Sequence, residues 1–238
     1  MTPAGAEARA RAITEELRRV GTPERAEGEK RYLKSDLEHF GATVLEIRAT
    51  ARRATRPGIS HAELVELVER LWSAPVHESR MAAIMLLDAN PKLLTPRDLE
   101  LVERMLRDAR SWAYVDVLAG DVAGAILLRH PDAEARLDRW AAESNFWIKR
   151  AALLALLQPL KHERGFERFA RYADAMLEEK EFFVRKAIGW VLREEGKRHP
   201  DEVFRWLEPR ARRASGVTLR EAVKYLRPEQ RAHLLRRG

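Results

Sequence analysis

The sequence predicts an all-α protein, built as a curved solenoid of stacked helix pairs. Ala, Leu, Arg and Glu dominate its 238 residues, whereas Gly and Pro number only 12 and 11, a composition that favours helices. Apolar residues recur at helical spacing along most of the chain, and one short motif returns at intervals near 35 residues. Such a period is typical of helical repeats that bury their apolar faces only by stacking, which leaves a concave surface.

The spacing of apolar residues justifies the individual helices. In the segment 64–72 they recur at i, i+3, i+4 and i+7 after Ser60, a residue type suited to cap a helix N-terminus. Thr95 and Pro96 supply a cap and a first-turn proline ahead of the apolar positions in 99–106. Prolines and glycines punctuate the chain every few turns. These signals predict helices separated by short junctions.

The repeating motif is an arginine followed two residues later by alanine and then by apolar helix. It occurs at Arg80, Arg150, Arg185 and Arg220, at intervals of 70, 35 and 35 residues. The first interval spans two periods, so one member is missing between Arg80 and Arg150. The missing place falls on Asp116, which lies 36 residues after Arg80 and 34 before Arg150. A carboxylate therefore stands where the repeat predicts a cation.

A second repeated motif supports the same period. The tetrapeptide Arg-His-Pro-Asp occurs at 129–132 and again at 198–201, which is 69 residues later. His130 and His199 within it are expected at helix junctions. Because no long linker divides the chain, we expect one repeat domain over 1–238, with N-terminal helices in 1–75 and repeats in 76–238.

Asp116 admits two interpretations. If the recurring arginines face a polyanion from the concave surface, a carboxylate among them is useful only where something cationic must be met. Alternatively, the arginines pair with acidic residues of neighbouring repeats, and Asp116 is one such partner. Trp112 lies one turn before Asp116 on the same helix face. Trp190 likewise shares a helix with a recurring arginine. The remaining tryptophans are expected in the core: Trp72, Trp140, Trp147 and Trp206.

Positive charge is concentrated at the C-terminal end. The whole chain has 44 Lys and Arg against 37 Asp and Glu, a net charge of +7. The segment 185–238 holds 15 of the basic and 7 of the acidic residues, a net charge of +8, which leaves −1 for 1–184. A localised basic surface is expected of a protein that binds nucleic acid. A solvated helical face rich in arginine is the alternative.

The composition excludes several classes of protein. Without cysteine there is no disulfide framework, iron–sulfur cluster or thiol nucleophile, which fits a reducing cytoplasm. The N-terminus lacks the apolar region of a signal peptide, and no run approaches the roughly 18 apolar residues that cross a membrane. The seven histidines show no zinc-binding spacing, and no glycine-rich phosphate loop is present. We expect a soluble, cytoplasmic protein that needs no metal and no cofactor.

Three segments carry a resemblance to a known family. They are Ser111-Trp112 with Val115-Asp116, the segment 145–152, and the segment 182–194, which contains Lys-Ala-Ile-Gly-Trp-Val-Leu-Arg-Glu. Together they resemble the bacterial AlkD family of alkylpurine DNA glycosylases, over nearly the whole chain. The resemblance implies a right-handed superhelical solenoid of HEAT-like repeats with a concave DNA-binding cleft. Members of that family carry Trp and Asp where this chain has Ser111 and Ala113.

The resemblance also implies a site and a reaction. Its catalytic residues would be Asp116, Trp112 and Trp190, and the residues that bind the DNA backbone would be Tyr32, Arg150, Lys186 and Arg193. The enzyme would hydrolyse the N-glycosidic bond of cationic alkylpurines in duplex DNA, such as N3-methyladenine and N7-methylguanine. It would act without base flipping, as a monomeric, monofunctional glycosylase of bacterial base excision repair that leaves an abasic site.

Physical chemistry makes one carboxylate sufficient for this reaction. Alkylation leaves the purine cationic, so the base departs neutral without a general acid, and a carboxylate stabilises the oxocarbenium-like sugar and orients water. An indole face against the cationic nucleotide adds about 0.5–2 kcal/mol. Stacking at roughly 10 Å per repeat would leave Trp190 and Asp116 about 20 Å apart, so curvature is needed to bring them together.

Two other functions stay open. One is a non-catalytic HEAT-like binder of bent or branched DNA, and the other is a protein scaffold. A pure DNA binder gains nothing from a carboxylate in a cationic groove, which favours the enzyme. A scaffold would bind duplex DNA weakly and almost independently of salt.

Overall fold

The computed structural model describes residues 3–56 and 58–237. Helices fill this part of the chain, and its sole β-type pairing is an isolated bridge between Glu38 and Val76. The helices group into two compact units, Met1–Leu101 and Val102–Gly238. The all-α prediction is therefore confirmed, while the expectation of one domain over 1–238 stays a prediction. In the described segments, every helix is too short or too polar to cross a membrane.

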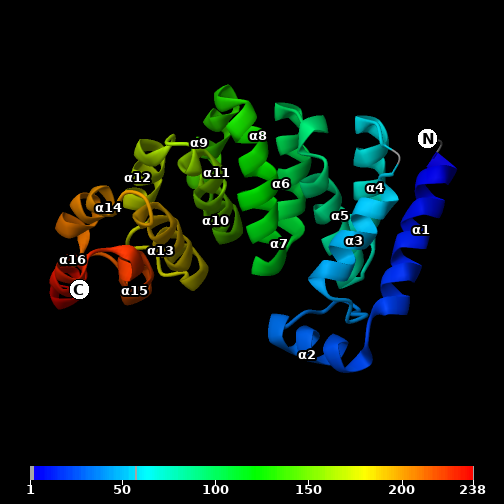
Figure 1. The fold of residues 1–238 in the computed structure, drawn as a ribbon, viewed down its shortest axis with the longest axis horizontal. Helices are drawn as coiled ribbons and strands as arrows, with labels where there is room; N and C mark the ends of the chain where they lie inside the picture. Colours follow the sequence, from blue (N-terminus) through cyan, green and yellow to red (C-terminus); the bar gives the residue numbers. More distant parts are fainter. Residues whose placement is uncertain (1–2, 57, 238) are drawn as a thin grey trace. The chain divides into compact units, whose positions relative to one another are not determined.

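The first unit is a cluster of helices around an aliphatic core (Figure 1). Helices α1, α3, α4 and α5 pack on one another, whereas α2 buries none of its own residues. The Ser60 hydroxyl and the Glu63 carboxylate form a capping box at the start of α4, as the sequence predicts. Its elements are α1 (Pro3–Val20), α2 (Pro23–Leu33), α3 (Val44–Ala54), α4 (His61–Ser73), α5 (His77–Ala89), η1 (Pro91–Leu93) and η2 (Pro96–Asp98).

The second unit stacks its helices in a row, in which α7, α10, α13 and α15 each pack on the next. The helix signal at Thr95 and Pro96 is confirmed, since η2 continues directly into α6 (Leu99–Asp108). The helices that follow are α7 (Trp112–Val117), α8 (Gly124–Arg129), α9 (Ala135–Ala141), α10 (Phe146–Leu154), α11 (Leu157–Lys161), α12 (Phe166–Ala175), α13 (Phe182–Gly196), α14 (Pro200–Leu207), α15 (Gly216–Ala222) and α16 (Pro228–Arg237). Short 3-10 turns separate several of them: η4 (Pro131–Glu134), η5 (Glu208–Arg210) and η6 (Val223–Tyr225).

Contacts between helices of the second unit follow the period seen in the sequence. Side-chain hydrogen bonds recur between residues 34 to 36 positions apart: Tyr172 with Asp138, Arg213 with Glu178, Arg107 with Glu143, and Arg210 with Asp174. His130 and His199 adopt nearly the same backbone angles (φ −132° and −125°, ψ 76° and 61°), and each precedes a proline at a helix start. The repeat predicted from sequence is therefore a repeat of structure.

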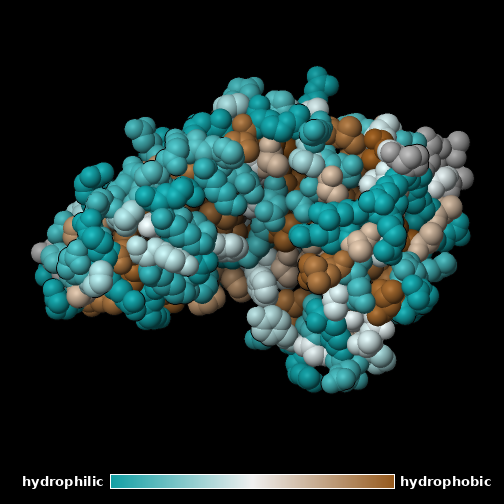
Figure 2. Space-filling view, viewed as in Figure 1, coloured by the Kyte–Doolittle hydropathy of each residue, from teal (hydrophilic) through white to brown (hydrophobic). Residues whose placement is uncertain are grey.

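Four tryptophans were expected in the core, and the structure buries two of them. Trp140 and Trp206 are buried, and the Trp140 indole donates to Glu103 at 2.9 Å. Trp72 and Trp147 are only partly buried, so the expectation is wrong for these two. Hydrophilic side chains cover most of the face shown in Figure 2, as expected when the apolar stripes of the helices pack inward.

The helix that carries Asp116 is interrupted by a π-helical segment. Between α7 and α8 the helix widens over η3 (Leu118–Ala123), a local form that adds a residue to the turn. Gly124 directly follows it, and a Cβ there would lie 2.9 Å from the Gln158 side chain and 3.3 Å from the Ala155 carbonyl oxygen. The glycine thus permits the close contact of α8 with α11. This contact also sets the position of α7, because α7 continues through η3 into α8.

Candidate active site

Asp116 is bound by Arg150 from the next helix of the row. Arg150 Nε donates to Asp116 Oδ1 at 2.7 Å, and Arg150 Nη2 donates to Oδ2 at 2.9 Å. Such a bidentate pair fixes the plane of the carboxylate as well as its distance. The ion-pair alternative from the sequence is therefore confirmed for Asp116, and its partner is one of the recurring arginines.

The same guanidinium brings aromatic residues of α13 to Asp116. Arg150 Nη1 donates to the carbonyl oxygen of Phe183 at 2.5 Å, and its Cζ lies 5.8 Å from the Phe183 ring and 5.9 Å from the Trp190 ring. Asp116 and Trp190 thus meet around one guanidinium. A straight stack would leave these two residues about 20 Å apart. The Arg150 side chain contacts both of them, because α10 packs against both α7 and α13.

The first turn of α7 carries Trp112, a second tryptophan expected in the site. Trp112 is its first residue, one turn before Asp116, and is partly exposed. The Ser111 hydroxyl accepts a hydrogen bond from the Ala113 backbone N–H at 3.3 Å and so caps the helix. Ser111 thereby holds the first turn of α7 in place.

Two basic residues of α13, together with Lys224, bind a second carboxylate, that of Glu221. Glu221 of α15 accepts hydrogen bonds from Lys186 Nζ at 2.6 Å, from Arg193 Nη1 at 2.6 Å and from Lys224 Nζ at 3.0 Å. Burial would raise the pKa of Glu221, but hydrogen bonds from Lys186 and Lys224 outweigh it and lower the pKa to about 2. Three cations therefore share one carboxylate, and a net positive charge remains.

The structure thus joins most of the expected site residues and adds two that the sequence analysis missed. Asp116, Arg150 and Trp190 form one contact group, and Lys186 with Arg193 forms another. The missed residues are Phe183 and Glu221. Glu221 lies 35 residues after Lys186, so the repeat period was the signal that could have found it. Tyr32 belongs to the first unit, where its side chain is exposed on α2.

The recurring arginines do not share one environment. Arg80 and Arg185 each donate Nε to a carbonyl oxygen six residues earlier, that of Ala74 at 3.3 Å and that of Glu179 at 2.5 Å. Arg150 is buried on Asp116, and Arg220 is exposed. The shared motif therefore marks equivalent places in the repeat rather than a uniform ligand surface.

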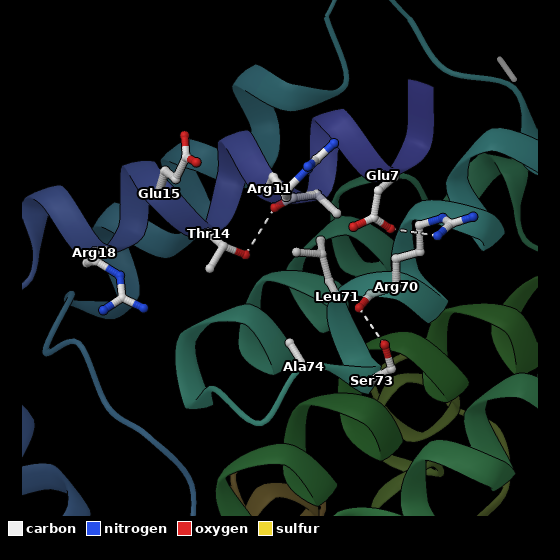
Figure 3. A pocket seen from close by; sticks show the side chains of 10 residues that line it. Glu7, Arg11, Thr14, Glu15, Arg18, Arg70, Leu71, Ser73 and Ala74 are labelled. Atoms are coloured by element: carbon white, nitrogen blue, oxygen red, sulfur yellow. Dashed lines mark hydrogen bonds and ion pairs between the residues drawn. The ribbon is translucent and has the colours of Figure 1, made fainter. Parts of the chain in front are cut away.

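Two pockets lie away from these residues. One, of about 520 Å³, is lined by α1 and α4, where Glu7 accepts from Arg70 at 2.7 Å (Figure 3). The other, of about 630 Å³, lies between α14 and the segment that carries Arg227 and His233. Both are lined by acidic and basic side chains together, so neither adds to the Asp116 group.

Comparisons with known proteins agree with this architecture. No curated protein matches the sequence. A predicted DNA alkylation repair enzyme from Enterococcus faecalis has a similar structure, with a TM-score of 0.75 and 25% identity over 87% of this chain and 97% of that one. AlkD2 from Streptococcus mutans is similar in fold, with a TM-score of 0.61 and 20% identity over 84% and 96% of the two chains. The smu.31 protein of Streptococcus mutans gives 0.60 and 20% over 77% and 93%.

The family resemblance seen in the sequence is confirmed over most of the chain. A family model described as DNA alkylation repair enzyme matches residues 13–226, which include every site residue discussed above. The stacked helices, the period of their contacts and this match all lead to one conclusion. The chain belongs to the DNA alkylation repair enzyme family.

Proposed function

We propose that the protein is a monofunctional DNA glycosylase that removes cationic N3- and N7-alkylpurines from duplex DNA. The observation that carries the proposal is the Asp116 carboxylate, oriented through both oxygens by the Arg150 guanidinium, whose Cζ lies 5.9 Å from the Trp190 ring. Membership in the DNA alkylation repair enzyme family supports it. A fixed negative charge next to aromatic planes suits a substrate whose sugar and base both carry positive charge during the reaction.

In the proposed reaction the bond between the sugar C1′ and the purine nitrogen breaks first. Its electron pair neutralises the alkylated ring, so the base leaves without a proton. The sugar becomes an oxocarbenium ion, which the Asp116 carboxylate stabilises. Water then adds to C1′ and releases its proton to the carboxylate or to solvent, leaving an abasic site. A carboxylate has about four acceptor positions, and Arg150 occupies two of them, so both oxygens keep capacity for water.

The neighbouring cations supply the contacts to DNA in this proposal. Lys186, Arg193 and Lys224 together bring three positive charges to Glu221. Glu194, which also contacts Arg193, is matched by Lys197, so the group keeps a net charge of +2 for phosphates. Arg150 has five N–H donors and uses three on Asp116 and the Phe183 carbonyl. The other two are proposed to meet the DNA backbone when binding uncovers the Arg150 side chain, which is 4% exposed in the free protein. Tyr32 is proposed to contact the backbone from α2. Trp112 and Trp190 are proposed to face the lesion nucleotide without base flipping.

The test is base release from a duplex that carries one N7-methylguanine. Wild type should release the free base and leave a strand that breaks only on later treatment with alkali, whereas Asp116→Asn should release little. Asp174→Asn is a matched control, since Asp174 is bound by Arg210 through the same two bonds at 2.7 and 2.6 Å. No release by wild type, or equal release by Asp116→Asn, contradicts the proposal.

A second candidate is a non-catalytic binder of bent or branched DNA. The pairing of Asp116 with Arg150 favours it, because the carboxylate already has a structural partner. Tight binding to a branched duplex, together with no release of N7-methylguanine or N3-methyladenine, would establish this function. A protein scaffold is tested by the same titrations, because only a binder of phosphates shows a steep fall of affinity with salt.

A further inference from the structure

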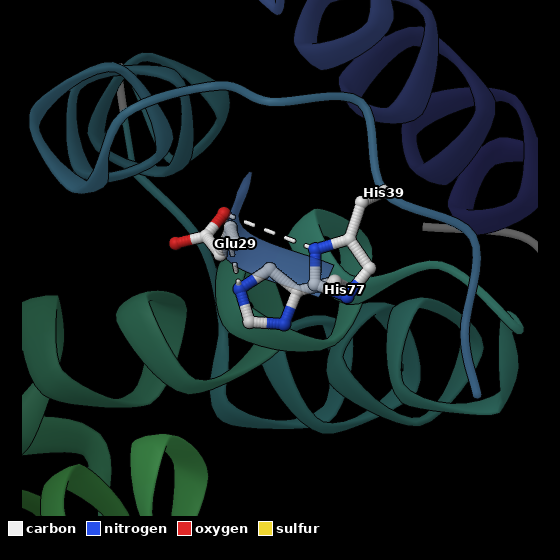
Figure 4. A group of neighbouring side chains, drawn as sticks. All are labelled: Glu29, His39 and His77. Carbon is white, nitrogen blue, oxygen red and sulfur yellow. Dashed lines mark ion pairs between the residues drawn. The ribbon is translucent and has the colours of Figure 1, made fainter. Parts of the chain in front are cut away.

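Three metal-ligand side chains meet in the first unit (Figure 4). Glu29 comes from α2, His39 from the loop that follows it, and His77 is the first residue of α5. Glu29 Oε2 lies 3.9 Å from His39 Nδ1 and 3.9 Å from His77 Nε2. The imidazole side chains are 1% and 4% exposed, and their rings stack at 4.4 Å between centroids.

Several polar atoms of this cluster are buried without a hydrogen-bond partner. They are Glu29 Oε2 and both ring nitrogens of His39. A buried polar atom without a partner is energetically costly, and nearly all such atoms in folded proteins are satisfied. The other oxygen of Glu29 accepts from Arg25 Nη2 at 3.2 Å, which leaves Oε2 turned to the two rings. A single ligand between these atoms would give a partner both to the Glu29 carboxylate and to a ring nitrogen of His39.

The backbone holds the two histidines side by side. His77 N–H donates to the Glu38 carbonyl at 2.9 Å, and Glu38 N–H donates to that of Pro75 at 3.0 Å. The buried carboxylate of Glu78 accepts from Phe40 N–H at 2.9 Å and from Gly41 N–H at 2.6 Å. These bonds fix residues 38–41 against residues 75–78. The cluster is therefore preorganised by its main chain rather than by its side chains alone.

We propose that Glu29, His39 and His77 bind one Zn²⁺ ion. The three donor atoms all lie within 4.8 Å of one another. In a tetrahedral shell with bonds of roughly 2.0–2.2 Å, donors are about 3.4 Å apart, so the side chains must close in modestly and the stacked rings must turn toward the ion. Two imidazoles and one carboxylate are a zinc donor set that leaves the fourth position to water.

A second cluster of the same kind shows why the first is preferred. Glu195, His199 and Glu202 also lie within 4.8 Å of one another. However, His199 Nε2 pairs with Glu163 at 2.5 Å, and Glu195 accepts from Arg198 at 3.1 Å. Two of its three donor groups therefore already have an ion-pair partner in the protein. This cluster therefore serves as an internal control for the proposed site.

The proposed ion has a structural consequence for α2. Because α2 buries none of its residues, its attachment to α5 depends on few contacts, and an ion that joins Glu29 to His77 would fasten it. The exposed Tyr32 is carried by this helix. The inference does not depend on what Tyr32 contacts, so it stands apart from the proposed glycosylase activity.

Metal titration of the full chain tests the site directly. Protein stripped with EDTA is titrated with Zn²⁺ by calorimetry and with Co²⁺ by visible spectroscopy, since tetrahedral Co²⁺ absorbs far more strongly than the hydrated ion. Wild type should bind one ion, and the affinity should fall about 100-fold or more in His39→Asn and in Glu29→Gln. His61→Asn and His199→Asn should bind as wild type does. Zn²⁺ should also slow tryptic cleavage at Lys30, Arg31 and Lys34.

Circular dichroism decides whether each variant is folded. Glu29→Gln keeps the size of the side chain at a partly exposed position, so it tests the site even if His39→Asn fails to fold. Absence of saturable binding by wild type overturns the proposal. Binding that survives Glu29→Gln but is lost in His199→Asn also overturns it, because the ion would then belong to the other cluster.

Discussion

Two arginine–aspartate pairs of the second unit have the same geometry and different surroundings. Arg150 binds Asp116 through Nε and Nη2 at 2.7 and 2.9 Å, and Arg210 binds Asp174 through the same atoms at 2.7 and 2.6 Å. The side chains of Asp116 and Arg150 are 17% and 4% exposed, whereas those of Asp174 and Arg210 are 36% and 26% exposed. The hydrogen bonds of the two pairs are therefore alike, and they do not distinguish a candidate active site from a purely structural ion pair.

The neighbours of each pair explain the difference. Arg210 lies 4.7 Å from the Trp206 ring and donates to the Trp206 carbonyl on its own chain segment, so its contacts lock one helix end. Arg150 reaches α13, where the Trp190 ring and the cations around Glu221 are found. Both pairs lie near a tryptophan ring, so the Asp116 pair differs in its deeper burial and in its contact with the helix that also carries Lys186 and Arg193. Its burial then strengthens every electrostatic contact.

The largest difference is expected in the chemical step. Asp116→Asn should lower the single-turnover rate of base release about 10²–10³-fold, the effect typical of losing one electrostatic contact to a transition state. Asp174→Asn, which alters the matching pair, should leave the rate within a factor of two or so of wild type. Rates measured with enzyme in excess over an N7-methylguanine duplex separate this effect from binding. Equal losses in both variants would show that the pairs serve stability alone.

Replacing Arg150 should lower the free energy of unfolding more than replacing Arg210. Arg150→Met leaves Asp116 without its partner in a mostly buried place and should lower the free energy of unfolding by about 3 kcal/mol. Arg210→Met breaks a more exposed pair and should cost about 1 kcal/mol. Urea titrations monitored by circular dichroism provide the comparison. A smaller loss for Arg150→Met than for Arg210→Met would contradict the assigned role of burial.

Acid should weaken the Glu221 cluster in a defined pH window. The folded-state pKa of Glu221 is lowered from 4.5 to about 2, so its stabilising contribution is present above pH 4.5 and is lost as the pH falls toward 2. Glu221→Gln should therefore reduce the free energy of unfolding at pH 6 by about 2 kcal/mol, after allowance for solvent screening. The gap from wild type should shrink between pH 4.5 and 2. A gap that stays constant with pH would assign the loss to packing.

The smallest expected effect concerns a single phosphate contact. Lys186→Met should reduce the slope of log affinity against log salt by about 0.9 for unmodified duplex DNA, because one condensed counterion fewer is released. Asp116→Asn removes no cation and should not reduce the slope. Fluorescence anisotropy at several salt concentrations measures both. An unchanged slope in Lys186→Met would place its ammonium away from the DNA and leave it a partner of Glu221 only.

Repeats in the sequence predicted the fold and part of the site. The period near 35 residues placed Asp116 and Arg150 in consecutive repeats, and their contact follows from that placement. The same period did not reveal Glu221, because the residue between the arginine and the alanine of the motif differs in every repeat. It also did not distinguish buried Arg150 from exposed Arg220, since both follow the same local pattern. Whether an arginine is buried depends on which helix packs over it, and this packing cannot be predicted from the neighbouring residues in the sequence.

The sequence by itself determined the helices, their caps, the spacing of the repeats and the family. These features depend on residues within one or two turns, or on a period that is visible along the chain. Only the tertiary structure decided that one guanidinium joins Asp116 to Trp190, that three cations share Glu221, and that Glu29, His39 and His77 converge. Apart from the contact of Lys224 with Glu221, three positions away, those contacts join residues that lie 10 to 48 positions apart. Side-chain reach across packed helices, rather than any local pattern, determines them.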